Sequence, residues 1–153
     1  MQSHNQKTIK ETINLRGVGL HNGIVSNLKI IPADENFGIK FCRSDINKKN
    51  LIDANYQNVV EPILCTKIKN ENGATVSTVE HLMAAFFGEG VDNALVEIDS
   101  SEIPILDGSA NDFVEAIKSV GIKEQKELRN YIKVLKKVEI QDGEFFLCSF
   151  CQG

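Results

Sequence analysis

Two adjacent residues, Glu80 and His81, have side chains that could carry out metal-assisted hydrolysis. A neutral imidazole is a common zinc ligand, and a neighbouring carboxylate could act as general base on a metal-activated water. At about 100° per residue of helix, both side chains project away from the expected apolar stripe, toward a face that Ala84 and Ala85 leave sparsely filled. The pair is therefore a candidate base beside a candidate metal ligand.

Each residue of this pair also has an ordinary structural explanation. Ser77 and Glu80 have the S-x-x-E spacing of a helix capping box, which needs no catalytic role. A single histidine near a helix start is commonly a partly exposed polar residue. The motif is not HExxH, because Ala85 stands where the second histidine would be. Spacing alone leaves both interpretations open.

His21 and Asp107 are weaker candidates. His21 lies in RGVGLHNG, residues 16–23, where three glycines predict a tight turn. A histidine there could reach a ligand or could simply be on the surface, and no phosphate-loop GKS or GKT follows. Asp107 could be a catalytic carboxylate, but we favour a structural role in which it accepts backbone N–H bonds ahead of the next helix.

The cysteines Cys148 and Cys151 form a single C-x-x-C pair. One pair cannot complete a tetrahedral zinc site, which needs about four ligands. A thioredoxin-like motif would follow a strand and open a helix, whereas this pair comes in the last residues of the sequence. We therefore interpret both as ordinary thiols rather than as a metal or redox centre.

Two helices are expected to position these side chains. The first is Thr78–Phe87, with an apolar stripe at helical spacing and glycines 88 and 90 ending it. The second is Ser109–Val120, with Gly121 after it. The expected stripe of the first helix consists of Val79, Leu82, Met83, Phe86 and Phe87, and that of the second consists of Phe113, Ala116, Ile117 and Val120.

Short strands account for most of the remaining chain. The candidates are Thr8–Leu15, Ser26–Ile31, Gly38–Arg43, Ile63–Lys69, Asn93–Ile98, Tyr131–Ile140 and Glu144–Cys151. The last two are joined by a turn at Gln141–Gly143 that contains Asp-Gly, and the charged stretch Glu124–Arg129 reads as a linker. This pattern predicts an α+β fold: a two-layer domain of mostly antiparallel sheet with two helices packed on one face.

Bulk properties exclude several classes of protein. The net charge is -4, so no basic field favours nucleic acid as a partner. No apolar run approaches the roughly 18 residues of a membrane span, so we do not expect an integral membrane protein. The N-terminus lacks the apolar core of a signal peptide. Together these features favour a cytoplasmic location.

Five motifs in order resemble the UDP-3-O-acyl-N-acetylglucosamine deacetylases of lipid A biosynthesis. They are GVGLHNG (17–23), LCT (64–66), STVEHLMAA (77–85), DNALVEID (92–99) and EIPILDGSA (102–110). The resemblance implies zinc-dependent hydrolysis of the N-acetyl group of UDP-3-O-acyl-N-acetylglucosamine. It makes His81 one of three protein ligands to Zn²⁺ and Glu80 the general base. It assigns His21, Leu64, Cys65 and Thr66 to substrate binding.

The resemblance also implies that half of the site is missing. Family members have two similar α+β domains, and the other zinc ligands, in an HKxxD-type motif, belong to the second. The expected organisation is therefore a first domain at residues 1–127 and the start of an incomplete second domain at residues 128–153. We expect the isolated chain to have little or no activity, and its missing domain to come from a longer product or a second polypeptide.

Two further interpretations remain open. The chain could be a non-enzymatic remnant or UDP-sugar-binding module that keeps the fold without hydrolysis. The apolar strand Glu144–Cys151, with no visible partner sheet, also predicts self-association.

Overall fold

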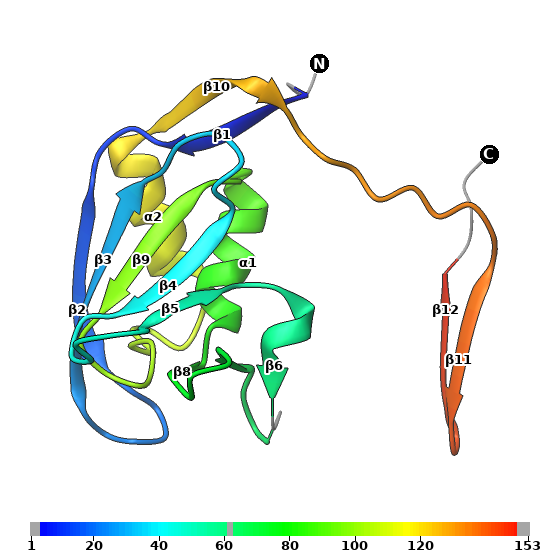
Figure 1. Cartoon of the computed structure of the whole chain (residues 1–153), viewed down its shortest axis with the longest axis horizontal. Helices are drawn as coiled ribbons and strands as arrows, with labels where there is room; N and C mark the ends of the chain where they lie inside the picture. The colour runs from blue at the N-terminus through cyan, green and yellow to red at the C-terminus, as the bar shows by residue number, and fades with distance from the viewer. Residues whose placement is uncertain (1–3, 61–62, 150–153) are drawn as a thin grey trace.

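A five-stranded sheet lies at the centre of the fold, as the computed structural model of residues 4–60 and 63–149 shows (Figure 1). The strand order is β2-β3-β9-β4-β5, and every neighbouring pair is antiparallel except β4 and β9. A parallel pair needs a crossover connection, and the first helix lies within it. The strands are β2 (Ile13–Val18), β3 (Val25–Pro32), β4 (Ile39–Arg43), β5 (Leu51–Asp53) and β9 (Ala94–Ile98).

Two helices, α1 (Glu80–Glu89) and α2 (Asn111–Val120), cover one face of this sheet (Figure 1). Alternate residues of the strands point toward the helices and are buried with the apolar sides of α1 and α2. The largest fully buried side chains include Leu28, Ile30, Phe41, Ile52, Leu82, Phe86, Ile98, Phe113 and Ile117. The predicted α+β class, with helices on one sheet face, is confirmed.

Three smaller sheets complete the described chain. β1 (Asn5–Ile9) pairs with β10 (Ile122–Leu128), and β6 (Val59–Val60), β7 (Lys67–Lys69) and β8 (Thr75–Ser77) form a second sheet after the short 3-10 helix Tyr56–Asn58. β11 (Val138–Asp142) and β12 (Phe145–Ser149) form a hairpin at the end of an extended segment (Figure 1).

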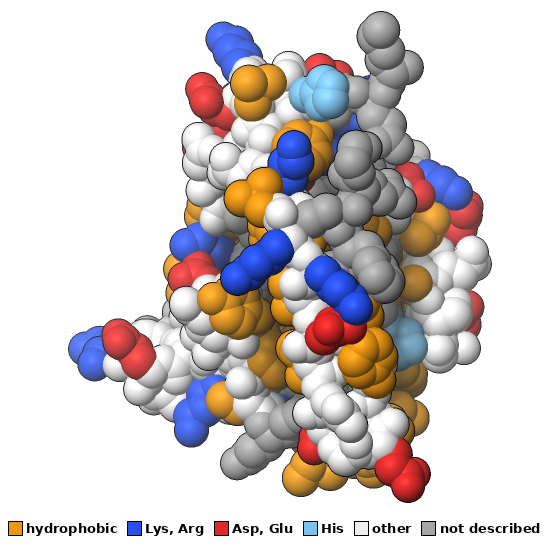
Figure 2. Space-filling view, turned by 90° about the vertical axis from the view of Figure 1, so that its right-hand side faces the viewer, with side chains coloured by type: hydrophobic (Ala, Val, Ile, Leu, Met, Phe, Trp, Pro, Cys, Tyr) orange, Lys and Arg blue, Asp and Glu red, His pale blue; other side chains and the backbone are white. Residues whose placement is uncertain are grey.

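The hairpin stands apart from the sheet-and-helix body in Figure 1. Figure 2 views the molecule from this side and shows hydrophobic side chains spread over the exposed surface. Ile132 is 98% exposed and Phe145 is 82% exposed. Arg129 ties the start of the extended segment to the body, because its guanidinium donates to the Asp92 carboxylate at 2.8 Å and to the Gly90 carbonyl at 2.6 Å. Tyr131, two residues later, has its ring edge-on to that of His4. The two described α-helices have ten residues each, and no helix among the described residues is long enough to cross a bilayer.

Three expected strands lie where the sequence places them: Ser26–Ile31, Gly38–Arg43 and Asn93–Ile98 coincide with β3, β4 and β9 to within a residue or two. The expected strand Thr8–Leu15 is wrong, because the chain leaves the β1–β10 pair after Ile9 and enters the central sheet at Ile13. Only Lys67–Lys69 of the expected Ile63–Lys69 strand is extended in a ladder.

The C-terminal expectations need two corrections. The charged stretch Glu124–Arg129 is not a linker, because most of it belongs to β10, where Gln125 points inward and its charged neighbours face solvent. The strand expected at Tyr131–Ile140 begins only at Val138. The hairpin itself is confirmed, with its turn at residues 143–144, one position later than expected. Cys151 lies outside the described residues.

Candidate functional site

The start of α1 is set by an unusual backbone conformation at Thr78. Ser77 ends β8, Thr78 has a φ of 58°, and helical conformation begins at Val79. A β-branched residue with positive φ is an outlier that persists only where its surroundings enforce it. Thr78 is 2% exposed, and its hydroxyl donates a 2.8 Å hydrogen bond to Glu102. The turn at Thr78 leads directly from the end of β8 into the first residues of α1.

The Glu80 carboxylate is held by the LCT segment rather than by a capping box. Its Oε2 accepts a hydrogen bond from the Thr66 N–H at 3.1 Å, while the Val79 N–H donates to the Thr66 carbonyl at 3.4 Å. The predicted capping box is wrong, because the Ser77 hydroxyl instead donates to the Ser101 carbonyl. The backbone of Thr66 is thus joined to the first turn of α1 and orients a half-buried carboxylate.

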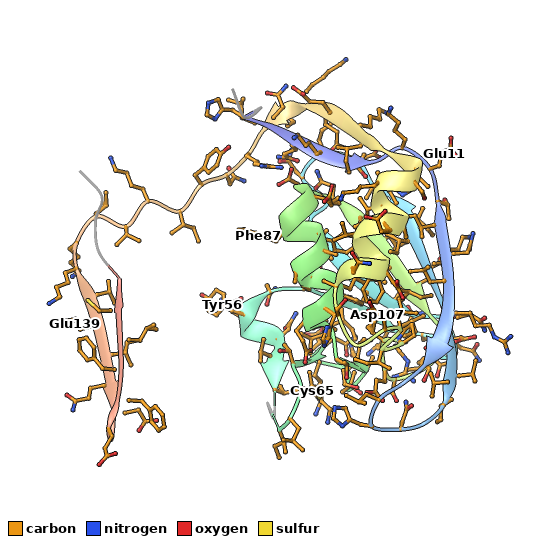
Figure 3. All side chains as sticks on the ribbon, turned by 180° about the vertical axis from the view of Figure 1, so that it is seen from behind. Glu11, Tyr56, Cys65, Phe87, Asp107 and Glu139 are labelled. Atoms are coloured by element: carbon orange, nitrogen blue, oxygen red, sulfur yellow. The ribbon has the colours of Figure 1, made fainter. Side chains whose placement is uncertain are left out.

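His81 follows Glu80 on α1 and is half-buried. The buried side of the helix consists of Leu82, Ala85 and Phe86. The expected sparse face is therefore partly wrong, because Ala85 is fully buried in the core. Phe87, expected in the apolar stripe, is instead 90% exposed and points outward from α1 (Figure 3).

A cavity of about 500 Å³ lies next to the start of α1. His21, Leu64 and Cys65 all line it, although they come from distant parts of the sequence, and Ser77 and Glu102 lie on its wall. Thr66, Glu80 and His81 do not line it. Figure 3 labels Cys65, one of these lining residues, at one end of the sheet-and-helix body. The structure therefore brings three of the four expected substrate-binding residues to one cavity and places Thr66 against Glu80.

Glu102 joins the two sides of this cavity. Its carboxylate is 1% exposed and accepts hydrogen bonds from the His21 N–H at 3.0 Å, the Asn22 N–H at 2.9 Å and the Thr78 hydroxyl at 2.8 Å. Burial raises the pKa of Glu102, but the hydrogen bonds from His21, Asn22 and Thr78 outweigh it and lower the pKa below its ordinary value. The carboxylate is therefore held in its charged form.

Sequence reasoning gave Glu102 no role. It stands in EIPILDG, and the available signal was a carboxylate in an otherwise apolar run. Asp107 in the same segment accepts from the Ser109 N–H at 2.9 Å and is exposed. That bond agrees with a local role in shaping the loop before α2.

Among the described residues, His81 is a candidate for one ligand of a metal site, which is fewer than a catalytic zinc site uses. Catalytic zinc sites use three protein ligands and an open position. In residues 4–60 and 63–149, no group of three His, Cys, Asp or Glu side chains is close enough together to hold a metal. His81 offers one imidazole beside the fixed carboxylate of Glu80. The Cys148 thiol donates a 3.9 Å hydrogen bond to a Glu139 carboxylate oxygen.

Comparisons with known proteins agree on one family. Residues 6–151 match the family model described as UDP-3-O-acyl N-acetylglycosamine deacetylase. A relative from Shewanella halifaxensis, named UDP-3-O-acyl-N-acetylglucosamine deacetylase, is 46% identical over 139 residues, which cover 91% of this chain and 45% of that protein. One of the same name from Pasteurella multocida is 43% identical, covering 91% of this chain and 46% of its own length. The chain spans about half the length of the curated relatives it matches.

Proposed function

The chain belongs to the UDP-3-O-acyl N-acetylglycosamine deacetylase family, and on that premise we propose that it forms the first half of a zinc-dependent deacetylase. Its reaction would be hydrolysis of the N-acetyl group of UDP-3-O-acyl-N-acetylglucosamine in lipid A biosynthesis, in the cytoplasm. One observation carries the proposal: the Thr66 N–H fixes the Glu80 carboxylate at the start of α1, next to His81. A held carboxylate next in sequence to an imidazole supports the proposal of a proton acceptor near a metal ligand.

Each residue has a proposed part in the reaction. His81 would hold zinc through its imidazole, and zinc would supply Lewis acidity toward the amide carbonyl. Glu80 would take a proton from the attacking water at its carboxylate, and the Thr66 N–H would keep that carboxylate in place. His21, Leu64 and Cys65 would contact the UDP-sugar at their cavity.

The remaining zinc ligands would come from residues outside this chain. One imidazole is too few for a catalytic site, and the described residues contain no cluster of three metal-ligating side chains. We infer that residues 1–127 form the first domain, and that the hairpin after it begins a second one. The chain alone would then have little or no activity.

Acetate release tests this proposal directly. We expect no turnover of UDP-3-O-acyl-N-acetylglucosamine by the purified, zinc-loaded 153-residue chain. We expect turnover from a chimera in which this chain replaces the matched part of the Shewanella halifaxensis relative. Turnover by the chain alone would show that its own residues complete the site.

A UDP-sugar-binding module without hydrolysis is the second candidate. The cavity beside His21 favours it, because that cavity forms without any of the missing ligands. Isothermal titration of the chain with the UDP-sugar, combined with an acetate assay, separates the two. A module would bind the sugar, and its chimera would release no acetate.

A further inference from the structure

The turn that carries His21 and the start of α1 are more than 50 residues apart in the sequence and meet at one buried side chain, Glu102. The Glu102 Oε1 accepts from the His21 N–H at 3.0 Å and from the Thr78 hydroxyl at 2.8 Å. Its Oε2 accepts from the Asn22 N–H at 2.9 Å. One carboxylate is therefore shared by both sides of the cavity.

The two segments that Glu102 joins cannot hold these positions by local preference alone. Thr78 has a φ of 58°, which a β-branched residue rarely adopts. In the turn, a Cβ atom on Gly19 would lie 2.6 Å from the Glu102 Oε2, so the glycine is what allows the carboxylate to approach the backbone. Both segments are shaped around Glu102.

The backbone of Glu102 is anchored as well. Its carbonyl accepts from the buried Ser26 hydroxyl at 3.3 Å, and the next N–H, that of Ile103, donates to the Ser77 carbonyl at 3.1 Å. The carboxylate therefore projects from a fixed point between β3 and β8. Because its backbone is anchored, the Glu102 side chain can fix the positions of the His21 turn and the start of α1 relative to each other.

We propose that Glu102 is a positioning residue, which sets the His21 turn and the start of α1, with Glu80 and His81, in their relative places. Its importance for catalysis rests on the proposed function, but the coupling itself does not. Glu102 is not placed in contact with substrate or metal. Its effect on the site passes through Thr78 on one side and through the amides of His21 and Asn22 on the other.

The test uses nuclear magnetic resonance on the 153-residue chain with Glu102→Gln. Glutamine keeps the shape of the side chain but replaces one acceptor oxygen with a donor, so at least one of the three donors loses its partner. We expect amide hydrogen exchange at His21 and Asn22 to become about tenfold faster or more, and by a larger factor than at the amides of central strand β9, whose exchange follows the stability of the whole fold. We also expect the imidazole signals of His21 and His81 to shift and that of His4 to stay.

Two controls make the experiment specific. Glu71→Gln changes an exposed carboxylate in the same way and should leave all three histidine signals in place. Thr78→Ser keeps the hydroxyl that binds Glu102, whereas Thr78→Val removes it with little change of shape. We expect the serine variant to keep the wild-type His81 signal and the valine variant to shift it.

The proposal is overturned if folded Glu102→Gln matches Glu71→Gln at His21 and His81. It is equally overturned if exchange rises at β9 as much as at His21, since that pattern would indicate general destabilisation. If Glu102→Gln does not fold, the test is the comparison of Thr78→Ser with Thr78→Val. Identical His81 imidazole signals in these two variants contradict the proposal. None of these readouts needs hydrolysis, so an inactive chimera would refute the proposed function and leave this coupling standing.

Discussion

Individual residues at this site are fixed mainly by backbone groups of other segments. The Thr66 N–H holds Glu80, and the N–H groups of His21 and Asn22 hold Glu102. Bonds to a charged acceptor are among the stronger hydrogen bonds in proteins, and backbone donors cannot rotate away. The two carboxylates therefore have defined orientations without depending on a neighbouring cation for them.

Stability in acid should report on Glu102. Its pKa is lowered on folding, so its contribution to stability is full above the ordinary value of 4.5 and is lost as pH falls through the folded pKa. At pH 7 we expect Glu102→Gln to reduce the free energy of unfolding by about 1–3 kcal/mol. Urea unfolding from pH 7 down to acid should show a smaller loss in this variant than in wild type.

The same titration with Glu71→Gln is the matched control. Glu71 is exposed, so its variant should follow the wild-type acid curve. The pKa of the Asp45 carboxyl is also lowered, mainly by a hydrogen bond from Arg43. Asp45 is unchanged in these variants, so its contribution to stability in acid is the same in all of them. Parallel curves for wild type and Glu102→Gln would contradict the account of Glu102.

At the scale of elements, α1 connects the sheet to the site. It begins at the strained Thr78 turn and ends at Gly90, which has a φ of 73° and whose N–H bonds to the carbonyls of Phe86 and Phe87. The Gly90 carbonyl also accepts from Arg129, which binds Asp92. Each end of the helix is therefore held by a residue far away in the sequence.

Two glycines near the end of α1 should respond oppositely to alanine. Gly90→Ala places a Cβ atom in a left-handed conformation and 3.0 Å from the Arg129 guanidinium, so we expect a loss of about 1 kcal/mol or more. Gly88→Ala lies within the helix with open space around it and should gain about 0.5–1 kcal/mol. Denaturant unfolding measures both, and equal effects of the two changes would contradict the assignment of Gly90 as the helix end.

Some elements could be predicted from the sequence because their periodicity is local. β3 alternates buried and exposed residues, β9 alternates buried and partly buried ones, and α2 buries Phe113 and Ile117 four residues apart. β10 was not predicted because its one buried side chain, Gln125, is polar, so the sequence shows no apolar residue at the buried position. The Gln125 amide is hydrogen-bonded to Asn93 and to the Ala33 carbonyl.

The site was only partly predictable for a related reason. Glu80, His81 and the turn around His21 carry chemistry that residue types reveal. Glu102 acts through partners 24 to 81 residues away, and no spacing rule links them. The predicted capping box does not form, because the Glu80 carboxylate accepts a hydrogen bond from the Thr66 N–H instead. This tertiary contact overrides the local motif.

At the scale of the molecule, the hairpin β11–β12 exposes apolar side chains in the part of the chain that the structure describes. Phe145, Phe146 and Leu147 are 82%, 62% and 68% exposed, and within the described residues β12 pairs only with β11. Exposed apolar strands with free edges favour pairing with another chain. We infer that this apolar surface packs against either further residues of the same protein or a second copy of the chain.

Sedimentation velocity tests the association of isolated chains. We expect the sedimentation coefficient of the 153-residue chain to rise with concentration. Phe146→Lys should weaken that rise, because a charge on an edge strand opposes pairing. Tyr56→Lys, which changes an aromatic residue that is 84% exposed elsewhere on the surface, should leave it unchanged. A monodisperse monomer at high concentration would contradict the prediction.

The central claim is that Glu80 and His81 supply a general base and one zinc ligand to an active site completed by residues outside this chain. The most direct measurement is the rate of acetate release by the Shewanella halifaxensis chimera carrying Glu80→Gln, compared with the same chimera carrying Glu71→Gln. Loss of a general base should slow turnover by about 10²- to 10⁴-fold, with unchanged zinc content, and the Glu71 change should have no effect. Equal rates in the two chimeras would contradict the claim.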